Sequence, residues 1–361
     1  MNHAVYIHIP FCSSICSYCD FCKFLYNKEW VLKYLKSLKE EIKDRYMGEE
    51  IKTIYIGGGT PSALSLKEIE FILLLTDTFK KNNLEEFTFE CNIEDINEDL
   101  LSLLKKFGVN RLSIGIESFN KDKLEFMKRN VNYDDALNKI KTIRSYGFNN
   151  INLDLIYAIP NEKLRTLKKD LKYLISLNPE HISTYSLEIN NNTYLSFKHT
   201  TPISDEKDCE MYNFICKYLK KKGYHHYEVS NFSKEGYESK HNLTYWNNEE
   251  YYGFGCGASG YSCGVRYENT RNLSNYIKGE YKSQEELIGD KGKMEYELIL
   301  GLRKLEGINL RAFYDKYQVN MQDVFPIKPL LSNGDLIYDK GYIKINPEKL
   351  YVMNEILLKL V

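Results

Sequence analysis

The feature that most constrains this chain is a regular alternation of short β-rich runs with longer segments of helical periodicity. The β-rich runs are residues 4–9, 53–56, 87–91, 111–116, 151–156 and 181–187. Between them, segments such as 30–46 and 100–107 repeat apolar residues three and four positions apart, as helices packed on a sheet do. This pattern predicts an α/β fold whose parallel strands and right-handed helical crossovers close wholly or partly into a barrel. We expect the reactive residues at the carboxyl ends of the strands.

The alternation loosens after about residue 190. A helix is predicted over residues 205–222, then a stretch rich in Tyr, Gly and Asn runs to about residue 270, and mostly helical sequence follows. We therefore expect a core barrel over residues 1–190, a barrel-extending segment over 191–270 and a smaller, mostly helical region over 271–361. No low-complexity linker separates these parts, so we expect them to pack together.

Composition and charge narrow the class of protein. Lys plus Arg (49) and Asp plus Glu (50) nearly cancel, so no overall basic field exists to recruit nucleic acid. No stretch of about 18 apolar residues predicts a membrane span, and the N-terminus has no basic segment followed by an apolar one as in a signal peptide. We expect a cytoplasmic protein whose nine cysteines are thiols or metal ligands rather than disulfides.

Three cysteines stand together on the loop that leaves the first predicted strand. Cys12, Cys16 and Cys19 form a CxxxCxxC pattern. Three thiolates on one short loop can hold three irons of a [4Fe-4S] cubane and leave the fourth iron open for a small ligand. A structural zinc site with Cys22 as fourth ligand, or chance clustering, are the alternatives. The remaining thiols lack ligand spacing and are interpreted as packed residues, namely Cys91, Cys209, Cys216, Cys256 and Cys263.

Six motifs occur in an order that resembles the radical SAM family containing oxygen-independent coproporphyrinogen III oxidase and the HemW-type haem chaperone. They are YIHIPFC (6–12), IYIGGGTPS (54–62), GVNRLSIGIESFN (108–120), NLDLIYAIP (152–160), PEHISTYSLEI (179–189) and HNLTYWNNEEYYGFGCGA (241–258). The resemblance covers most of the chain. It implies a partial (β/α)6 barrel in which the cluster binds S-adenosylmethionine (SAM).

The resemblance also implies a set of SAM contacts. Glycines let the backbone approach a ligand closely, a carboxylate can accept hydrogen bonds from ribose or an amino group, and an arginine can grip the methionine carboxylate. Asp154 interrupts an apolar strand, where an unpaired carboxylate would be costly, so a partner or ligand is expected. The implied contacts are Tyr6, Tyr18, Gly57, Gly58, Gly59, Thr60, Glu90, Glu117, Arg129 and Asp154.

Three positions depart from the pattern of the family. Glu117 stands where the family usually has glutamine, so a group that only accepts hydrogen bonds when ionised replaces one that also donates. Ala158 stands where glycine is usual, and Arg129 is not followed by the histidine that often accompanies it. These departures put the SAM contacts near Glu117 in question.

Three features favour the chaperone branch over the oxidase. The chain begins directly at the first predicted strand, whereas the oxidases carry a long N-terminal extension, and its extra cysteine gives CxxxCxxCxxC rather than CxxxCxxCxC. The segment HNLTYW (241–246) resembles the HNxxYW motif of the chaperones, whose histidine is implicated in haem binding. An imidazole is a suitable axial ligand of haem iron, so His241 is the candidate haem contact.

Three functional hypotheses therefore stand. The chain is a haem chaperone that transfers haem to acceptor proteins, an oxidase that decarboxylates coproporphyrinogen III to protoporphyrinogen IX, or a non-catalytic scaffold that retains the fold. The first two also require an electron donor protein. The intact Cys12, Cys16 and Cys19 and the glycine motif argue against the scaffold.

Overall fold

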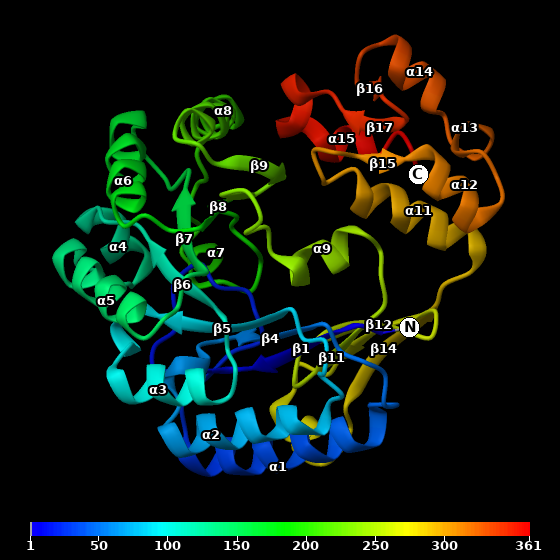
Figure 1. Ribbon diagram of the computed structural model, residues 1–361. Coiled ribbons are helices and arrows are strands. Elements are labelled where there is room, and N and C mark those ends of the chain that lie inside the picture. Colours follow the sequence, from blue (N-terminus) through cyan, green and yellow to red (C-terminus); the bar gives the residue numbers. More distant parts are fainter. Residues whose placement is uncertain (1) are drawn as a thin grey trace.

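The computed structural model describes residues 2–361, and in this range twelve strands form one large sheet. Its centre is six parallel strands, in the order β1, β4, β5, β6, β7, β8 (Figure 1). They are β1 (Ala4–Ile9), β4 (Thr53–Gly58), β5 (Glu86–Asn92), β6 (Arg111–Glu117), β7 (Ile151–Tyr157) and β8 (His181–Ser186). All six predicted strands are confirmed, and their parallel pairing makes the partial barrel that the alternation indicates.

The sequence did not indicate how both edges of this sheet are extended. One edge continues through β11 (Tyr251–Phe254), which is parallel to β1, into the antiparallel strands β12 (Ser259–Ser262), β13 (Val265–Asn269) and β14 (Lys282–Leu287). The other edge continues from β8 through β10 (Asn231–Ser233) to β9 (His225–Glu228). The segment rich in Tyr, Gly and Asn therefore contains the strands β9 to β13. Its glycines allow close approach: a Cβ on Gly253 would lie 1.8 Å from the Ser259 carbonyl oxygen.

Helices cover the outer face of the parallel strands (Figure 1). They are α1 (Lys28–Arg45), α2 (Leu66–Leu75), α3 (Glu98–Lys106), α4 (Lys121–Met127), α5 (Tyr133–Ser145), α6 (Leu164–Ser176) and α8 (Asp205–Lys221), with 3₁₀ turns η1 (Pro61–Ala63), η2 (Thr76–Thr78) and η3 (Ile93–Asp95). Helix α1 shows why such a segment becomes a helix packed on the sheet. Asn27 caps its start by accepting a hydrogen bond from the Trp30 N–H, and Val31, Leu35 and Leu38 form its buried stripe.

The C-terminal region is more mixed than the predicted helical segment. Its helices are α10 (Leu273–Ile277), α11 (Asp290–Gly301), α12 (Leu310–Tyr317), α13 (Met321–Val324), α14 (Ile327–Ser332), the 3₁₀ helix η4 (Pro347–Val352) and α15 (Met353–Leu357). A small antiparallel sheet of β15 (Ile308–Asn309), β17 (Tyr342–Ile345) and β16 (Leu336–Asp339) joins them. The region packs on the barrel through α11 against α9 (Lys240–Trp246) and through η4 against α8. The division at residue 270 remains a prediction, and β14 beyond it belongs to the large sheet.

The inside of the barrel is polar where the outside is apolar. Side chains alternate across a strand, so every second residue of β5 to β8 faces the same interior. The polar residues at these positions are Glu86, Thr88, Glu90, Arg111, Ser113, Asn152, Asp154, His181 and Ser183. Buried polar groups need partners, so this interior is a hydrogen-bonded lining rather than a second core. None of the helices in residues 2–361 is both long and apolar enough to cross a membrane.

Candidate functional site

The predicted cysteine ligands lie at the carboxyl end of the parallel strands. Cys12 ends the short strand β2 (Phe11–Cys12), which pairs with β3 (Phe24–Leu25), so the intervening residues 13–23, the cysteine loop, are closed at their base. Its middle is fastened to α4 because the Ser17 N–H donates to Met127 O (3.2 Å) and the Ser17 hydroxyl to Phe126 O (2.7 Å). All three thiols line one open cavity of about 1270 Å³.

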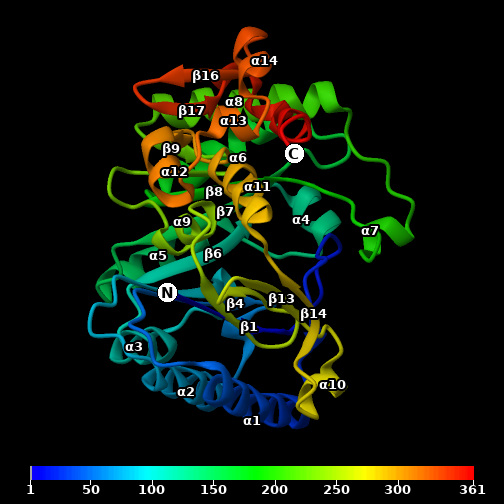
Figure 2. The same ribbon diagram turned by 90° about the vertical axis from the view of Figure 1, so that its right-hand side faces the viewer.

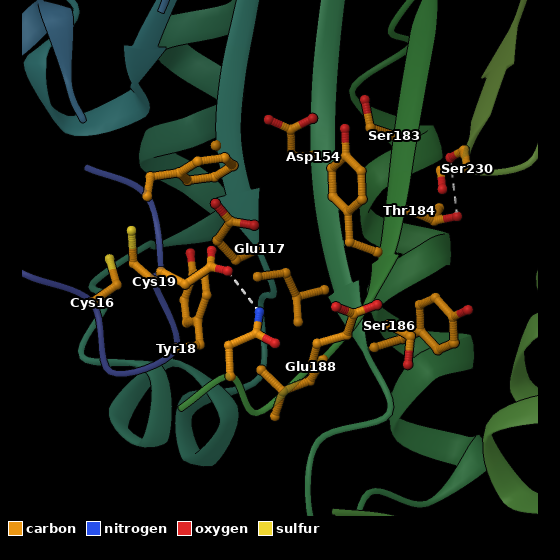
Figure 3. Close-up of a pocket in the computed structure, with 18 of the residues that line it drawn as sticks. Cys16, Tyr18, Cys19, Glu117, Asp154, Ser183, Thr184, Ser186, Glu188 and Ser230 are labelled. Atoms are coloured by element: carbon orange, nitrogen blue, oxygen red, sulfur yellow. Dashed lines mark hydrogen bonds between the residues drawn. The ribbon is translucent and has the colours of Figure 1, made fainter. Parts of the chain in front are cut away.

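Figure 3 shows Cys16 and Cys19 on one side of this cavity, near Tyr18 and Glu117, while Ser186 and Glu188 line the other side. Cys22 is absent from the lining. Its sulfur lies 3.8 Å from that of Cys256. Cys22 therefore packs against Cys256, away from the cavity.

The glycine motif at the end of β4 has no room for side chains. A Cβ on Gly57 would lie 2.6 Å from the Glu90 carboxyl carbon, and one on Gly59 would lie 2.9 Å from the Cys12 sulfur. Gly58 has a φ of 122°, which glycine adopts at little cost, and its Cβ would meet the His8 ring at 2.6 Å. Thr60 follows, buried, with its N–H donating to Phe11 O at 2.9 Å. The backbone of the glycine motif therefore packs directly against β2, which carries Cys12, and against Glu90.

Glu90 is held by two donors. The Tyr55 hydroxyl donates to its Oε1 at 2.7 Å and the Gly58 N–H donates to its Oε2 at 2.9 Å. Burial nevertheless raises the pKa of this carboxyl to about 7. A carboxylate fixed at the cavity wall can accept hydrogen bonds from a ligand, which is the role that the sequence predicts.

Arg129 and Glu117 form the opposite wall beside the cysteine loop. The Arg129 guanidinium donates to Asn92 Oδ1 (2.6 Å) and to Gly115 O (2.8 Å), while its buried Nε has no partner. Glu117 ends β6 in the left-handed region, with a φ of 64°, after an irregularity in the β6–β7 register. Burial raises the pKa of Glu117 to about 7 against the opposing effect of Arg129. Ala158, which stands where the family usually has glycine, also has a positive φ, 60°.

Asp154 lies deeper in the interior, where Asn152 Nδ2 donates to its Oδ1 at 2.8 Å. Sequence reasoning missed Arg111, which lines the same cavity below Asp154 and Glu90. It is 2% exposed, it donates to Thr88 Oγ1 at 3.4 Å, and its Nε is unpartnered. The sequence did offer one signal for Arg111: it lies two residues before Ser113, so both side chains face the polar side of β6. It supplies a fixed positive charge beneath two carboxylates.

The turns after β6 and β7 are tied together by a buried cluster that the sequence did not reveal. The Lys123 ammonium of α4 donates to Ile156 O (2.9 Å), Glu162 Oε1 (2.7 Å) and Asp170 Oδ2 (3.0 Å). Asp170 also accepts from the Ser118 hydroxyl at 2.7 Å. This Lys123 cluster holds α4 against β7, and Arg129 follows two residues after the end of α4.

The two tyrosines of the predicted site differ in position. Tyr18 lines the cavity, near Cys16 and Glu117 (Figure 3). Tyr6 does not line it, and its hydroxyl lies 2.9 Å from His8 Nδ1 behind Gly58. Tyr6 therefore supports the glycine motif from within the barrel.

His241 is not with the other site residues, contrary to the expectation that the reactive groups share the carboxyl ends of the strands. It lies on α9 at the amino end, 1% exposed, with Nδ1 2.8 Å from the hydroxyl of Thr53, the first residue of β4. Its Nε2 lies 2.7 Å from the Tyr245 hydroxyl. Burial lowers the pKa of His241 to about 3, so the imidazole is neutral.

The cavity fits the two groups that the cysteine pattern and the motifs imply. Cys12, Cys16 and Cys19 are free thiols on one wall, which is the donor set of an iron–sulfur cluster. The unpartnered Arg129 Nε and the side-chain-free glycine run suit the carboxylate and the main chain of an amino acid. The residues present are therefore compatible with a cluster and SAM side by side.

Comparison with known proteins places two parts of the chain in known families. Residues 6–174 match the radical SAM superfamily and residues 290–351 match the HemN C-terminal domain. The chain is 37% identical to the protein named heme chaperone HemW of Lactococcus lactis, over 99% of this chain and 97% of the relative. It is 36% identical to that of Bacillus subtilis, over 98% and 97%.

A solved structure shares the fold. Coproporphyrinogen III oxidase (HemN) from Escherichia coli, described as a radical SAM enzyme, superposes with a TM-score of 0.86 over 98% of this chain and 89% of the oxidase. The identity is 21%, so the likeness concerns the fold alone.

Proposed function

The chain belongs to the HemW family within the radical SAM superfamily, and from this premise we propose that it binds haem and transfers it to acceptor proteins. The observation that carries the proposal is the near full-length similarity to proteins named heme chaperones, together with an intact cavity at the cysteine loop. A cytoplasmic location, where thiols stay reduced, suits nine free cysteines.

In this proposal Cys12, Cys16 and Cys19 hold a [4Fe-4S] cluster, and SAM lies between the cysteine loop and the glycine motif. When bound, the cluster supplies an electron to the SAM sulfonium. The chain's own residues bind and orient SAM. Arg129 holds its carboxylate, the backbone of the glycine motif holds its amino group, and Glu90 accepts hydrogen bonds from ribose.

The haem contact is proposed at His241, and the geometry sets a condition on it. The neutral imidazole is the form that binds iron, but both ring nitrogens are engaged by Thr53 and Tyr245. Ligation therefore requires α9 to release the ring. We expect His241→Ala to weaken haem binding and Tyr245→Phe, which frees Nε2, to strengthen it. Haem titration followed by Soret absorbance measures both, and unchanged affinity in both variants would remove His241 from the site.

The oxidase is the second candidate, because the HemN structure shares the whole fold. One anaerobic experiment separates the two functions. The reconstituted protein is incubated with reductant, SAM and coproporphyrinogen III, while protoporphyrinogen IX and 5′-deoxyadenosine are followed. The chaperone proposal predicts a cluster and bound SAM without porphyrinogen product, and transfer of haem from the loaded protein to an apo-haem protein. Formation of protoporphyrinogen IX would establish the oxidase instead.

A further inference from the structure

Two thiols that the iron–sulfur assignment does not use lie together at the base of the cysteine loop. Cys22 is 6% exposed and follows Phe21, which is 63% exposed, whereas Cys256 is fully buried in the turn after β11. Their sulfur atoms are 3.8 Å apart, although the two residues are 234 positions apart in the sequence. The pair therefore joins two segments that are distant along the chain.

The backbone next to Cys256 packs directly against Cys22. A Cβ on Gly257 would lie 2.3 Å from the Cys22 Cβ, so the two chain segments touch here. A disulfide requires Cβ atoms about 3.5–4.5 Å apart and sulfur atoms about 2.05 Å apart. The two sulfur atoms therefore need to approach each other by roughly 2 Å, which side-chain rotation and a small movement of the loop can supply.

The cysteine loop rests here on the extended edge of the large sheet. The Cys256 sulfur lies 3.1 Å from the carbonyl oxygen of Thr270, the residue after β13. The guanidinium of the next residue, Arg271, donates to Asp20 O of the cysteine loop. Figure 2 shows β13, β14 and α10 in yellow, with α10 beside α1. A covalent bond between Cys22 and Cys256 would tie the cysteine loop to this edge of the sheet.

The two thiols differ in their readiness to react. A hydrogen bond with the Cys256 thiol lowers the pKa of Cys22 against the opposing effect of burial, and the positive charges of Arg271 and Lys23 also lower it. The same hydrogen bond and burial raise the pKa of Cys256. The thiolate is the nucleophile, so Cys22, which follows the exposed Phe21, is the sulfur that meets a small oxidant first.

We propose that Cys22 and Cys256 are a redox-active thiol pair that a peroxide oxidises to a disulfide. The Cys22 thiolate attacks one peroxide oxygen, the O–O bond breaks, and Cys22 becomes a sulfenic acid while hydroxide leaves and takes up the thiol proton as water. The Cys256 sulfur then attacks the Cys22 sulfur, so the S–S bond forms, the S–O bond breaks and a second water leaves. Two thiols are oxidised and one peroxide is reduced. The inference goes beyond the proposed function and requires neither cluster nor haem.

The test treats the reduced full-length protein with a small excess of hydrogen peroxide, alkylates the remaining thiols in denaturant and maps the digest by mass spectrometry. We expect loss of the Cys22 and Cys256 thiols and a peptide cross-linked through this pair, which the map separates from bonds among the three predicted cluster ligands. The midpoint of thermal unfolding should shift upward, because the bond closes a long loop of the chain. Dithiothreitol should reverse both changes.

Two variants make the outcome specific. Cys256→Ala should leave Cys22 as a sulfenic acid that dimedone labels, with no cross-link and no shift of the midpoint. Cys263→Ala, which removes an exposed thiol, should give the same cross-link as the wild type. Absence of the Cys22–Cys256 peptide in the wild type at a peroxide dose that oxidises Cys263 would overturn the proposal. Cross-links from Cys22 to Cys263 as frequent as those to Cys256 would also overturn it, because they would require the loop to leave its place.

Discussion

The two ends of the barrel use similar polar residues for opposite purposes. At the amino end, α9 covers the interior, and Glu86 accepts hydrogen bonds from the N–H groups of Lys240 (2.9 Å) and His241 (3.2 Å). At the carboxyl end the interior opens into the cavity, where Arg129 keeps a buried nitrogen without a partner. At the closed end Glu86 and His241 have protein partners, while at the open end Arg129 leaves a nitrogen available to a ligand.

This difference teaches which buried polar residues to regard as functional. His241, Thr53 and Tyr245 form a closed chain of hydrogen bonds, as a structural lid requires. Arg111 and Arg129 face the cavity with incomplete hydrogen bonding, as ligand-binding groups do.

The largest effect is expected where the open end is held rigid. Lys123→Ala leaves Glu162 and Asp170, which are fully buried, without their counter-ion, so we expect the free energy of unfolding to fall by about 3–5 kcal/mol. Urea denaturation of the protein measures it. Lys172→Ala, on the exposed face of α6, should change stability by less than about 0.5 kcal/mol. A comparably small loss for Lys123→Ala would show that the cluster does not brace the open end.

A smaller effect concerns ligand binding alone. Arg129→Met removes the guanidinium proposed to bind the SAM carboxylate, so we expect SAM affinity to fall about 10- to 150-fold, which corresponds to about 1.5–3 kcal/mol. Anaerobic calorimetry on the reconstituted protein gives this value, with iron content as the check on the cluster. Arg165→Met, an exposed arginine of α6, is the matched control. Wild-type affinity in Arg129→Met would mean that the open end does not bind SAM through this residue.

The smallest effect belongs to the closed end and depends on pH. His241 has a pKa of about 3 in the folded chain and an ordinary value of 6.5, so the unfolded chain binds the extra proton as pH falls below 6.5. Stability should therefore decrease toward acid pH, by about 2 kcal/mol from this residue at pH 5. Comparing urea midpoints of wild type and His241→Gln between pH 7 and pH 5 isolates the contribution. Identical pH dependence in the two proteins would mean that His241 is not buried and neutral.

The sequence predicts the open end better than the closed one, for physical reasons. The spacing of Cys12, Cys16 and Cys19 and the run Gly57–Gly59 are local patterns, and the alternation of Asp154 with apolar residues is visible within one strand. The six parallel strands follow from the same local periodicity. These features need no knowledge of distant contacts.

Contacts between residues that are distant in the sequence left no local pattern of this kind. In the Lys123 cluster, Glu162 and Asp170 lie 39 and 47 positions from Lys123. Arg111 resembles an ordinary charged residue at the start of a strand. The motif HNLTYW indicates His241 as a haem contact, but the position of His241 beside Thr53 of β4 depends on how α9 folds back across the barrel. Strands β11 to β13 were missed because frequent Gly and Asn resemble loop sequence.

The most direct test of the central claim, that the open end holds an iron–sulfur cluster on three cysteines, is iron content after anaerobic reconstitution. We predict about four irons per chain in the wild type, as in a [4Fe-4S] protein, and the same in Cys263→Ala, which alters an exposed thiol. Cys16→Ala should lose the cluster and its brown absorbance. Wild-type iron content in Cys16→Ala would contradict the assignment of the cysteine loop.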